Sequence, residues 1–211
     1  MTLRTFLLLF CACLGLSGCE RDISGLSEAP LSTDPVVFDD NFGAGVDFQA
    51  FQGSRLTAVQ IDHTTSYLGA ASLVVSVPEP GATNGGFAGG AFPTNTARNL
   101  SGYNALTFWA KASQALTMDI AGLGNDNTGT SKYEASWSGI PLTTEWTKVV
   151  IPIPLPARLA AERGLFFFAE GPKAEGGHRI WLDEIQFELV DGITDPRPAL
   201  TPGLVNAFAG T

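Results

Sequence analysis

The chain has 211 residues, with 12 basic against 21 acidic side chains and a formal net charge of −9 at neutral pH. The acidic balance excludes the extended basic patch with which nucleic-acid-binding proteins contact phosphates. The length is sufficient for one domain with a sizeable hydrophobic core.

The N-terminal segment has the pattern of an export signal. Arg4 precedes a short apolar run over residues 6–16, and the run ends in Leu-Ser-Gly-Cys at 16–19. This run is shorter than the roughly 20 apolar residues that a membrane-spanning helix needs. Leu-Ser-Gly-Cys resembles the lipobox of bacterial lipoproteins, in which the Cys is acylated. The resemblance implies a signal peptide at 1–18, a lipid on Cys19 and attachment to the cell envelope, at the outer membrane or the cell surface.

The cysteines support this interpretation. Cys11, Cys13 and Cys19 all lie in the leader or at its exit, so the mature domain has no thiol for a disulfide or a Cys-based metal site. Cleavage removes Arg4 and no acid, which gives a mature charge of −10. No second apolar segment is long enough to span a membrane.

Three further regions follow the leader. Residues 19–35 are polar, contain Gly, Ser and Pro, and are predicted to form a flexible tether. Residues 36–190 carry the pattern of a folded domain, and residues 191–211, with three prolines, are predicted to form a tail or linker.

Short strands dominate the predicted domain. The candidates are rich in Val, Ile, Phe, Trp and Thr, and Gly-, Pro- and Asn-containing turns separate them. They cover residues 36–39, 56–61, 72–77, 105–112, 116–121, 133–138, 147–153, 164–169 and 179–188. Only residues 157–163 have a helical pattern, for two turns at most. This organisation predicts an all-β sandwich or jelly roll with one short helix at most.

The last strand contains an unusual acid. Simple alternation over 179–188 places Asp183 on the same face as Trp181, Ile185 and Phe187, which is the apolar face. A buried carboxylate must be paired, hydrogen-bonded or bound to a metal ion, because burial of an isolated charge is costly.

Five motifs, in order, resemble carbohydrate-binding modules of the galactose-binding-like jelly-roll fold. They are Val-Phe-Asp-Asp-Asn-Phe at 37–42, Ser-Tyr-Leu-Gly-Ala-Ala-Ser-Leu at 66–73, Asn-Leu-Ser-Gly-Tyr-Asn-Ala-Leu-Thr-Phe-Trp-Ala-Lys-Ala at 99–112, Thr-Glu-Trp-Thr-Lys-Val-Val-Ile-Pro-Ile at 144–153, and Ile-Trp-Leu-Asp-Glu-Ile-Gln-Phe at 180–187. The resemblance covers most of the mature domain and implies a non-catalytic, glycan-binding role.

The same resemblance implies a structural calcium ion between the first and last strands. Its ligands would be Asp39 or Asp40, Asp183 and the backbone carbonyls near 67–69. Calcium takes six to eight oxygen ligands of these kinds. The alternative is that Asp183 accepts hydrogen bonds from a turn and that Asp39 and Asp40 are solvated.

Aromatic side chains are the candidate contacts for a poly- or oligosaccharide, because an aromatic face packs against the C–H groups of a pyranose ring. Trp109 and Lys111 share one face of their strand, and Tyr133 and Trp137 share one face of another. These four residues form a platform if both faces belong to the same sheet, and each Trp has core packing as its alternative. Trp146 and Trp181 stand beside β-branched runs and are predicted to pack in the core or at an edge.

The sequence favours a binding protein over an enzyme. His63 and His178 lie in no nucleophile or metal motif, and there is no Gly-x-Ser-x-Gly, His-Glu-x-x-His or phosphate-binding loop. A glycoside hydrolase needs two carboxylates, for which Glu134, Glu170 and Glu184 are the candidates. Glu170 ends an apolar strand, and a rim or turn position explains it as well. A structural or assembly lipoprotein that binds a protein partner is the main alternative, and a hydrolase is the weaker one.

Overall fold

The computed structural model describes residues 25, 27 and 29–193. Residues 31–193 belong to one compact unit. The predicted signal peptide, the lipidation site Cys19 and the tail beyond residue 193 lie outside the described residues. Among the residues that are described, no helix is long and apolar enough to cross a membrane.

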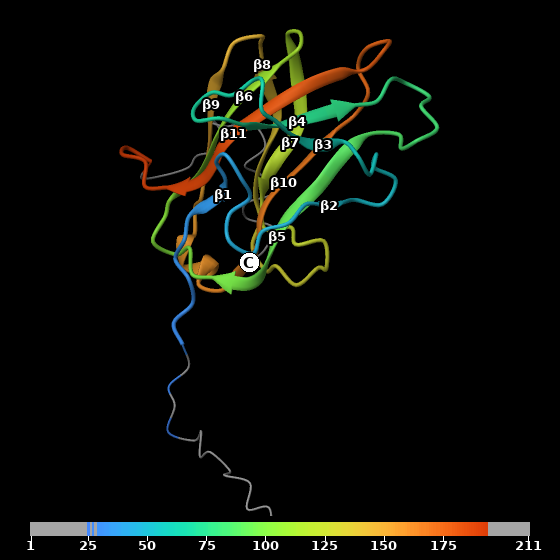
Figure 1. Ribbon diagram of the computed structural model, residues 1–211. Coiled ribbons are helices and arrows are strands. Elements are labelled where there is room, and N and C mark those ends of the chain that lie inside the picture. Colours follow the sequence, from blue (N-terminus) through green and yellow to red (C-terminus); the bar gives the residue numbers. More distant parts are fainter. Residues whose placement is uncertain (1–24, 26, 28, 194–211) are drawn as a thin grey trace, which may run out of the picture. The chain divides into compact units, whose positions relative to one another are not determined.

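One of two sheets contains the first and last strands of the domain. Its hydrogen-bonded order is β3-β4-β11-β6-β9, and β1 also pairs with β11. Every pair in it is antiparallel. The strands are β1 (Val36–Phe38), β3 (Val59–Asp62), β4 (Ser72–Val77), β6 (Ala105–Ala112), β9 (Thr147–Pro152) and β11 (His178–Glu188). Figure 1 shows β11 in the middle of this sheet, where it holds the N-terminal strand in place.

The second sheet has five strands in the order β2-β5-β10-β7-β8, again antiparallel throughout. Its strands are β2 (Gln49–Ala50), β5 (Ala88–Arg98), β7 (Leu116–Leu123), β8 (Ala135–Leu142) and β10 (Glu162–Glu170). A 3-10 helix, η1 (Pro156–Leu159), lies between β9 and β10. The prediction of an all-β sandwich with one short helix at most is confirmed.

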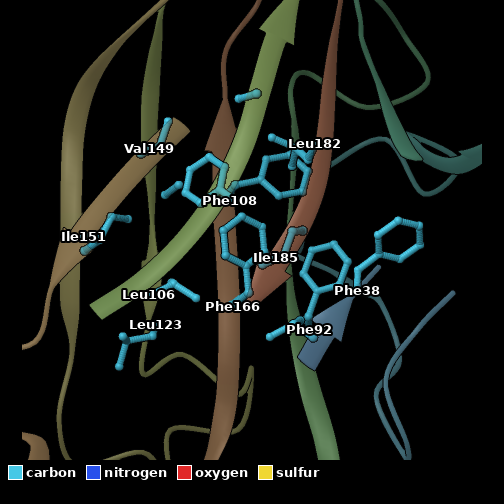
Figure 2. Close-up of a cluster of buried hydrophobic side chains, with 14 of the residues drawn as sticks. Phe38, Phe92, Leu106, Phe108, Leu123, Val149, Ile151, Phe166, Leu182 and Ile185 are labelled. Carbon is cyan, nitrogen blue, oxygen red and sulfur yellow. The ribbon is translucent and has the colours of Figure 1, made fainter. Parts of the chain in front are cut away.

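The core lies between the two sheets, and period-2 alternation supplies it. Leu106, Phe108 and Ala110 of β6 point inward, while the residues between them point outward. The Phe108 ring meets the Phe166 ring of β10 edge-on at 5.4 Å, a preferred geometry for two aromatic rings. Figure 2 shows these rings together with Phe38, Phe92 and aliphatic side chains from both sheets. Burial of each large side chain contributes about 2 kcal/mol.

Two segments differ from the sequence-based expectation. No strand was predicted between residues 78 and 104, but β5 begins in this Gly-rich region at Ala88. A Cβ on Gly90 would stand 2.5 Å from the carbonyl oxygen of Gln49, so the missing side chain lets β2 pair closely with β5. The helical pattern over 157–163 yields only the single turn of η1, because β10 already begins at Glu162.

A β-bulge interrupts the alternation of β11. Asp183 is opposite Trp109 and Gln186 is opposite Thr107. Between these two pairs β11 has two residues and β6 has one, which defines the bulge. Glu184 takes up the extra residue with a positive φ of 48°. The core face of β11 is therefore Ile180, Leu182, Ile185 and Phe187. The prediction that Asp183 shares the apolar face is wrong, because simple alternation does not count the bulge.

Candidate functional site

The outer face of the six-stranded sheet carries a cluster of aromatic side chains. Trp109 of β6 and Trp181 of β11 alternate with core residues and therefore point outward. Trp146 comes immediately before β9, and Tyr67 lies in the loop between β3 and β4. The three tryptophans are partly exposed, and Tyr67 keeps 41% of its surface exposed. These four residues are called the outer aromatic cluster below.

The rings of the cluster contact one another. Tyr67 stacks on Trp109 with ring centroids 3.7 Å apart and an interplanar angle of 12°. Trp146 meets Tyr67 edge-on at 6.1 Å. Tyr67 thus covers one face of Trp109, so a ligand above the sheet meets the partly exposed rings of Tyr67, Trp146 and Trp181.

Lys111 lies on the outer face of β6 and contacts two of these rings, those of Trp146 and Trp181. Its Nζ atom lies 5.8 Å from the ring centroid of Trp146 and 5.6 Å from that of Trp181. Both distances are within the range of a cation–π interaction. Lys111 and Trp181 are direct neighbours on β6 and β11, so strand register sets this geometry.

Trp181 is also fixed from its other side. Its indole Nε1–H donates a hydrogen bond of 2.8 Å to Oδ2 of Asp62 on β3. The hydroxyl of Thr64 donates to the same carboxylate and, with Trp181, holds the pKa of Asp62 at about 2. Asp62 is therefore a carboxylate at any pH above the acid range and keeps the Trp181 ring in one orientation.

A buried carboxylate holds the Tyr67 loop against the sheet. Asp183 points to the outer side of β11, next to Trp109, and is fully buried beneath this loop. The amides of Tyr67 and Leu68 donate to its Oδ2 at 2.7 and 3.2 Å, and the amide of Glu184 donates to Oδ1 at 2.8 Å. Burial raises the pKa of Asp183 and the nearby charge of Asp40 raises it further, against these three amides. The expectation that Asp183 is hydrogen-bonded, paired or metal-bound is met by backbone amides.

Asp40 supports the same loop from the end of β1. Its Oδ1 accepts the amides of Ala70 at 2.5 Å and Ala71 at 2.8 Å. Two carboxylates thus bind four amides of one loop, which places Tyr67 above Trp109. Asp39 is exposed, and its Oδ1 accepts only the amide of Asn41 at 3.1 Å.

The calcium ion implied by the sequence resemblance requires oxygen donors from this loop. The loop turns amide N–H groups of Tyr67 and Leu68 toward Asp183, and an N–H cannot ligate a cation. Within the described part of the chain, no three His, Cys, Asp or Glu side chains are close enough to share a metal ion. This donor set does not fit a cation that bridges Asp40 and Asp183. Calcium stays a sequence-based prediction, which melting temperatures in calcium chloride and in EDTA test.

The structure separates the four residues of the predicted platform. Trp109 and Lys111 lie on the outer face of β6, whereas Trp137 belongs to β8 in the other sheet. Trp137 packs against the core, next to Ala121 of β7. Tyr133 precedes β8, is 2% exposed, and its hydroxyl accepts the amide of Leu155 at 3.1 Å. The shared platform is therefore wrong, because its condition that both strands belong to one sheet is not met.

The sequence analysis did not identify three residues of the cluster as candidate binding residues. Trp146 and Trp181 were assigned to the core or an edge, and Tyr67 was considered only as a carbonyl donor. For Trp181 the signal was present, since Ile180 and Leu182 flank it and are stronger core residues. For Tyr67 no local pattern exists, because its position depends on the distant carboxylate of Asp183.

Glu170, the hydrolase candidate, is fully buried at the end of β10. Its Oε1 lies 2.9 Å from His178 Nε2 and 2.8 Å from Lys173 Nζ, and its Oε2 accepts the amide of Asp119 at 2.7 Å. Lys173 also pairs with Asp119 at 2.7 Å. A carboxylate that is enclosed in this way supports the fold and cannot reach a glycosidic bond.

Comparison with known proteins places this antiparallel sandwich in the class of carbohydrate-binding domains. The family Carbohydrate binding domain 30 matches residues 34–188. The chain belongs to this family. Carbohydrate-binding modules are non-catalytic domains, and membership of this family supports the glycan-binding class that the sequence predicted.

Solved structures of such modules are similar in fold. A family 30 carbohydrate-binding module has a TM-score of 0.50 and 17% identity, over 74% of this chain and 99% of that chain. The family 30 module of a cellulosomal cellulase of Clostridium thermocellum has a TM-score of 0.45 and 18% identity, over 76% and 96%. A family 29 module variant in complex with cellulohexaose has a TM-score of 0.44 and 17% identity, over 79% and 99%. No curated protein matches the sequence.

Proposed function

We propose that the domain binds a poly- or oligosaccharide chain on the outer aromatic cluster of the six-stranded sheet. The observation that carries this proposal is the grouping of three tryptophans and Tyr67 on one outer face, with their rings partly exposed. A contiguous group of partly exposed aromatic side chains, unlike a single one, is typical of a binding site. A sugar ring covers them at little desolvation cost because its C–H groups face the π surface.

The surroundings of the rings suit a sugar. Lys111 and Asp62 stand between or beside the rings and provide a donor and an acceptor for hydroxyl groups. Each is already anchored within the sheet, so little side-chain freedom is lost on binding. The rings come from β6, β11, the start of β9 and the Tyr67 loop, and such a spread fits several units of a chain better than one free monosaccharide.

Affinity electrophoresis of the purified chain through gels with different neutral polysaccharides tests the proposal. We expect at least one polymer to retard the chain, and Trp146→Ala to abolish the retardation. Trp137→Ala is the matched control, because it removes the same side chain from the other sheet. Equal retardation of wild type and Trp146→Ala on every polymer that binds would exclude the outer aromatic cluster as the site.

From the leader sequence we also infer that the domain is displayed on the bacterial envelope by a lipid on Cys19. The support is the apolar run and the Leu-Ser-Gly-Cys motif at 16–19. In cells that are fed a labelled fatty acid, we expect the chain to become labelled. Cys19→Ser should abolish the label and release the chain from the membrane fraction, and a label that persists in this variant would contradict the assignment.

A further inference from the structure

A hollow of about 440 Å³ adjoins the outer aromatic cluster at the start of β11. Trp181 forms one side of it, and Arg179, two residues earlier on the same face of β11, forms another. Arg55, from the segment before β3, and the side chains of Ser76 and Ser113 also line it. A ligand chain that lies on Trp181 therefore reaches two guanidinium groups within the next unit.

The charge of this hollow is opposite to that of the protein. Acidic residues outnumber basic ones by 21 to 12 in the chain, yet no Asp or Glu lines the hollow. Among the described residues, no carboxylate lies within ion-pair distance of Arg55 or Arg179. Glu79 lies in a neighbouring hollow, which Arg55 also lines, and it accepts the amide of Gly176 at 3.2 Å. Two guanidinium groups without counter-charges in a concave surface make a local positive potential.

Both arginines stand on fixed backbone. The amide of Arg55 donates to the carbonyl of Phe87 at 2.8 Å, and its carbonyl accepts the amide of Ala58 at 3.1 Å. Gly85 packs so closely on Arg55 that a Cβ there would stand 2.4 Å from the Arg55 nitrogen. Arg179 is opposite Ser76 in the sheet, and its amide donates to Ser113 Oγ at 3.1 Å. The backbone therefore fixes where both arginine side chains begin, at the rim of the hollow.

We propose that this hollow binds a carboxylate-bearing sugar, a uronate, within the glycan chain that the outer aromatic cluster holds. The proposal rests on the glycan-binding function proposed above and names the chemical class of one unit of the ligand. A guanidinium group matches a carboxylate with two parallel hydrogen bonds, and Arg is the preferred partner for planar anions. Trp181 supplies the aromatic face for the sugar ring, while Arg55 and Arg179 receive its carboxylate.

The test compares pairs of polymers that differ in their anionic groups. Isothermal titration uses the full-length chain in detergent and oligosaccharides of β-1,4-linked glucuronate or of β-1,4-linked glucose, of equal length. Polygalacturonate and its methyl ester form a second pair, and dextran sulfate and dextran a third. At 0.15 M salt, where the Debye length is about 8 Å, we expect a uronate polymer to bind about tenfold more tightly than its neutral partner, as one charged hydrogen-bonded contact provides.

The double variant Arg55→Ala/Arg179→Ala should reduce this uronate-to-neutral affinity ratio to about 1. The charge control is Arg158→Ala. It removes an exposed arginine of η1, which precedes β10 and does not line the hollow, so the ratio should stay unchanged. Thermal melting checks that all variants are folded. An unchanged ratio in the double variant, or an equal loss in Arg158→Ala, would overturn the proposal.

Two further outcomes separate the two proposals. If neutral polymers bind through Trp146 and uronate polymers bind no better, the uronate site is wrong and the aromatic site stands. If no polymer binds and Trp146→Ala has no effect, both fail. Preference for dextran sulfate without preference for either uronate polymer would also overturn the assignment, because it requires a tetrahedral anion instead of a carboxylate.

Discussion

The two sheets use tryptophan in opposite ways. On the six-stranded sheet, Trp109 and Trp181 alternate with core residues, point outward, and are partly exposed. On the five-stranded sheet, Trp137 of the edge strand β8 is also partly exposed but packs against the core, and its Nε1–H is buried without a hydrogen-bond partner among the described residues. The Nε1–H of Trp181 has a partner outside the core, Asp62. The phase of each Trp relative to its neighbouring core residues, and not its residue type, decides whether it packs on the core or lies on the outer face.

Two buried carboxylates extend the comparison. Asp183, under the Tyr67 loop, is bound by backbone amides, and its pKa is raised by burial. Glu170, at the end of β10, is bound by the side chains of Lys173 and His178. The first positions an element of the proposed site, whereas the second joins the ends of β10 and β11. Burial of a charge is costly in both places. The two carboxylates differ in the structural element that their hydrogen-bond partners fix.

The largest expected effects come from two Trp→Ala variants, one of which should lower stability and the other glycan affinity. Trp137→Ala should lower the free energy of unfolding by about 3 kcal/mol, because it empties space at the core, and leave glycan affinity unchanged. Trp146→Ala should do the reverse, with a loss of about 2 kcal/mol of binding free energy, about thirtyfold, as for an aromatic contact in a binding surface. Urea denaturation and titration calorimetry measure the two quantities.

Trp137→Phe sharpens this comparison. It keeps an aromatic ring at the core and removes the unsatisfied indole N–H, so its cost should be well below that of Trp137→Ala. A loss of affinity in either Trp137 variant, with the fold intact, would mean that the five-stranded sheet also contacts the ligand.

Removal of the Asp183 carboxylate should release the Tyr67 loop. Asp183→Ala leaves the amides of Tyr67, Leu68 and Glu184 without their acceptor, which costs about 2–3 kcal/mol of stability. Tryptophan fluorescence should change, because Tyr67 no longer stacks on Trp109. Asp183→Asn keeps one oxygen acceptor and should lose less. Stability and fluorescence equal to those of wild type in Asp183→Ala would show that the loop is held by other contacts.

Much of the fold follows from local patterns, since the nine proposed strands correspond to strands or strand portions of the sandwich. Asp183 was rightly expected to have a partner, because the cost of burying a charge is independent of the fold. The face of β11 predicted for Asp183 was wrong, because the bulge at Glu184 adds one residue and shifts the in–out alternation. The platform was wrong because β6 and β8 belong to different sheets, and sheet pairing is a long-range property. Tyr67 reaches the site through a contact 116 residues away in sequence.

The contributions of Asp119 and Asp183 to folding stability should change with pH in opposite directions. Burial opposes ionisation of Asp119, but the hydrogen bonds from Lys173 and the Gly171 amide outweigh it and lower its pKa. A lowered pKa stabilises the folded state above the ordinary value of 3.8, and this contribution is lost as the pH falls through the folded value. Asp183 has a raised pKa, so its contribution is present below 3.8 and is lost as the pH rises.

Asp119→Asn should therefore lower stability at pH 7 by about 0.5 kcal/mol, because half-exposed ion pairs are screened by solvent, and the difference from wild type should vanish in acid. Urea denaturation at pH 7 and at pH 2.5 measures it. Asp126→Asn is a control of the same chemistry in the loop after β7, where the hydroxyl of Thr130 is the partner. A difference for Asp119→Asn that grows in acid would reverse the assigned sign.

The smallest expected effect tests the bulge that separates the two faces of β11. Glu184 has a φ of 48°, a region that glycine adopts without strain, and burial together with the charges of Asp183, Asp39 and Asp40 raises its pKa. Glu184→Gly should raise the free energy of unfolding at pH 7 by about 0.3 kcal/mol, because the relief of left-handed strain slightly exceeds the conformational entropy that glycine adds to the unfolded chain. Glu184→Gln removes only the charge and should stabilise less. If Glu184→Gln stabilises as much as Glu184→Gly, charge repulsion alone limits this position, and the bulge is unstrained. If Glu184→Gly destabilises and also weakens glycan binding, the Glu184 side chain itself helps to keep Asp183 beneath the Tyr67 loop.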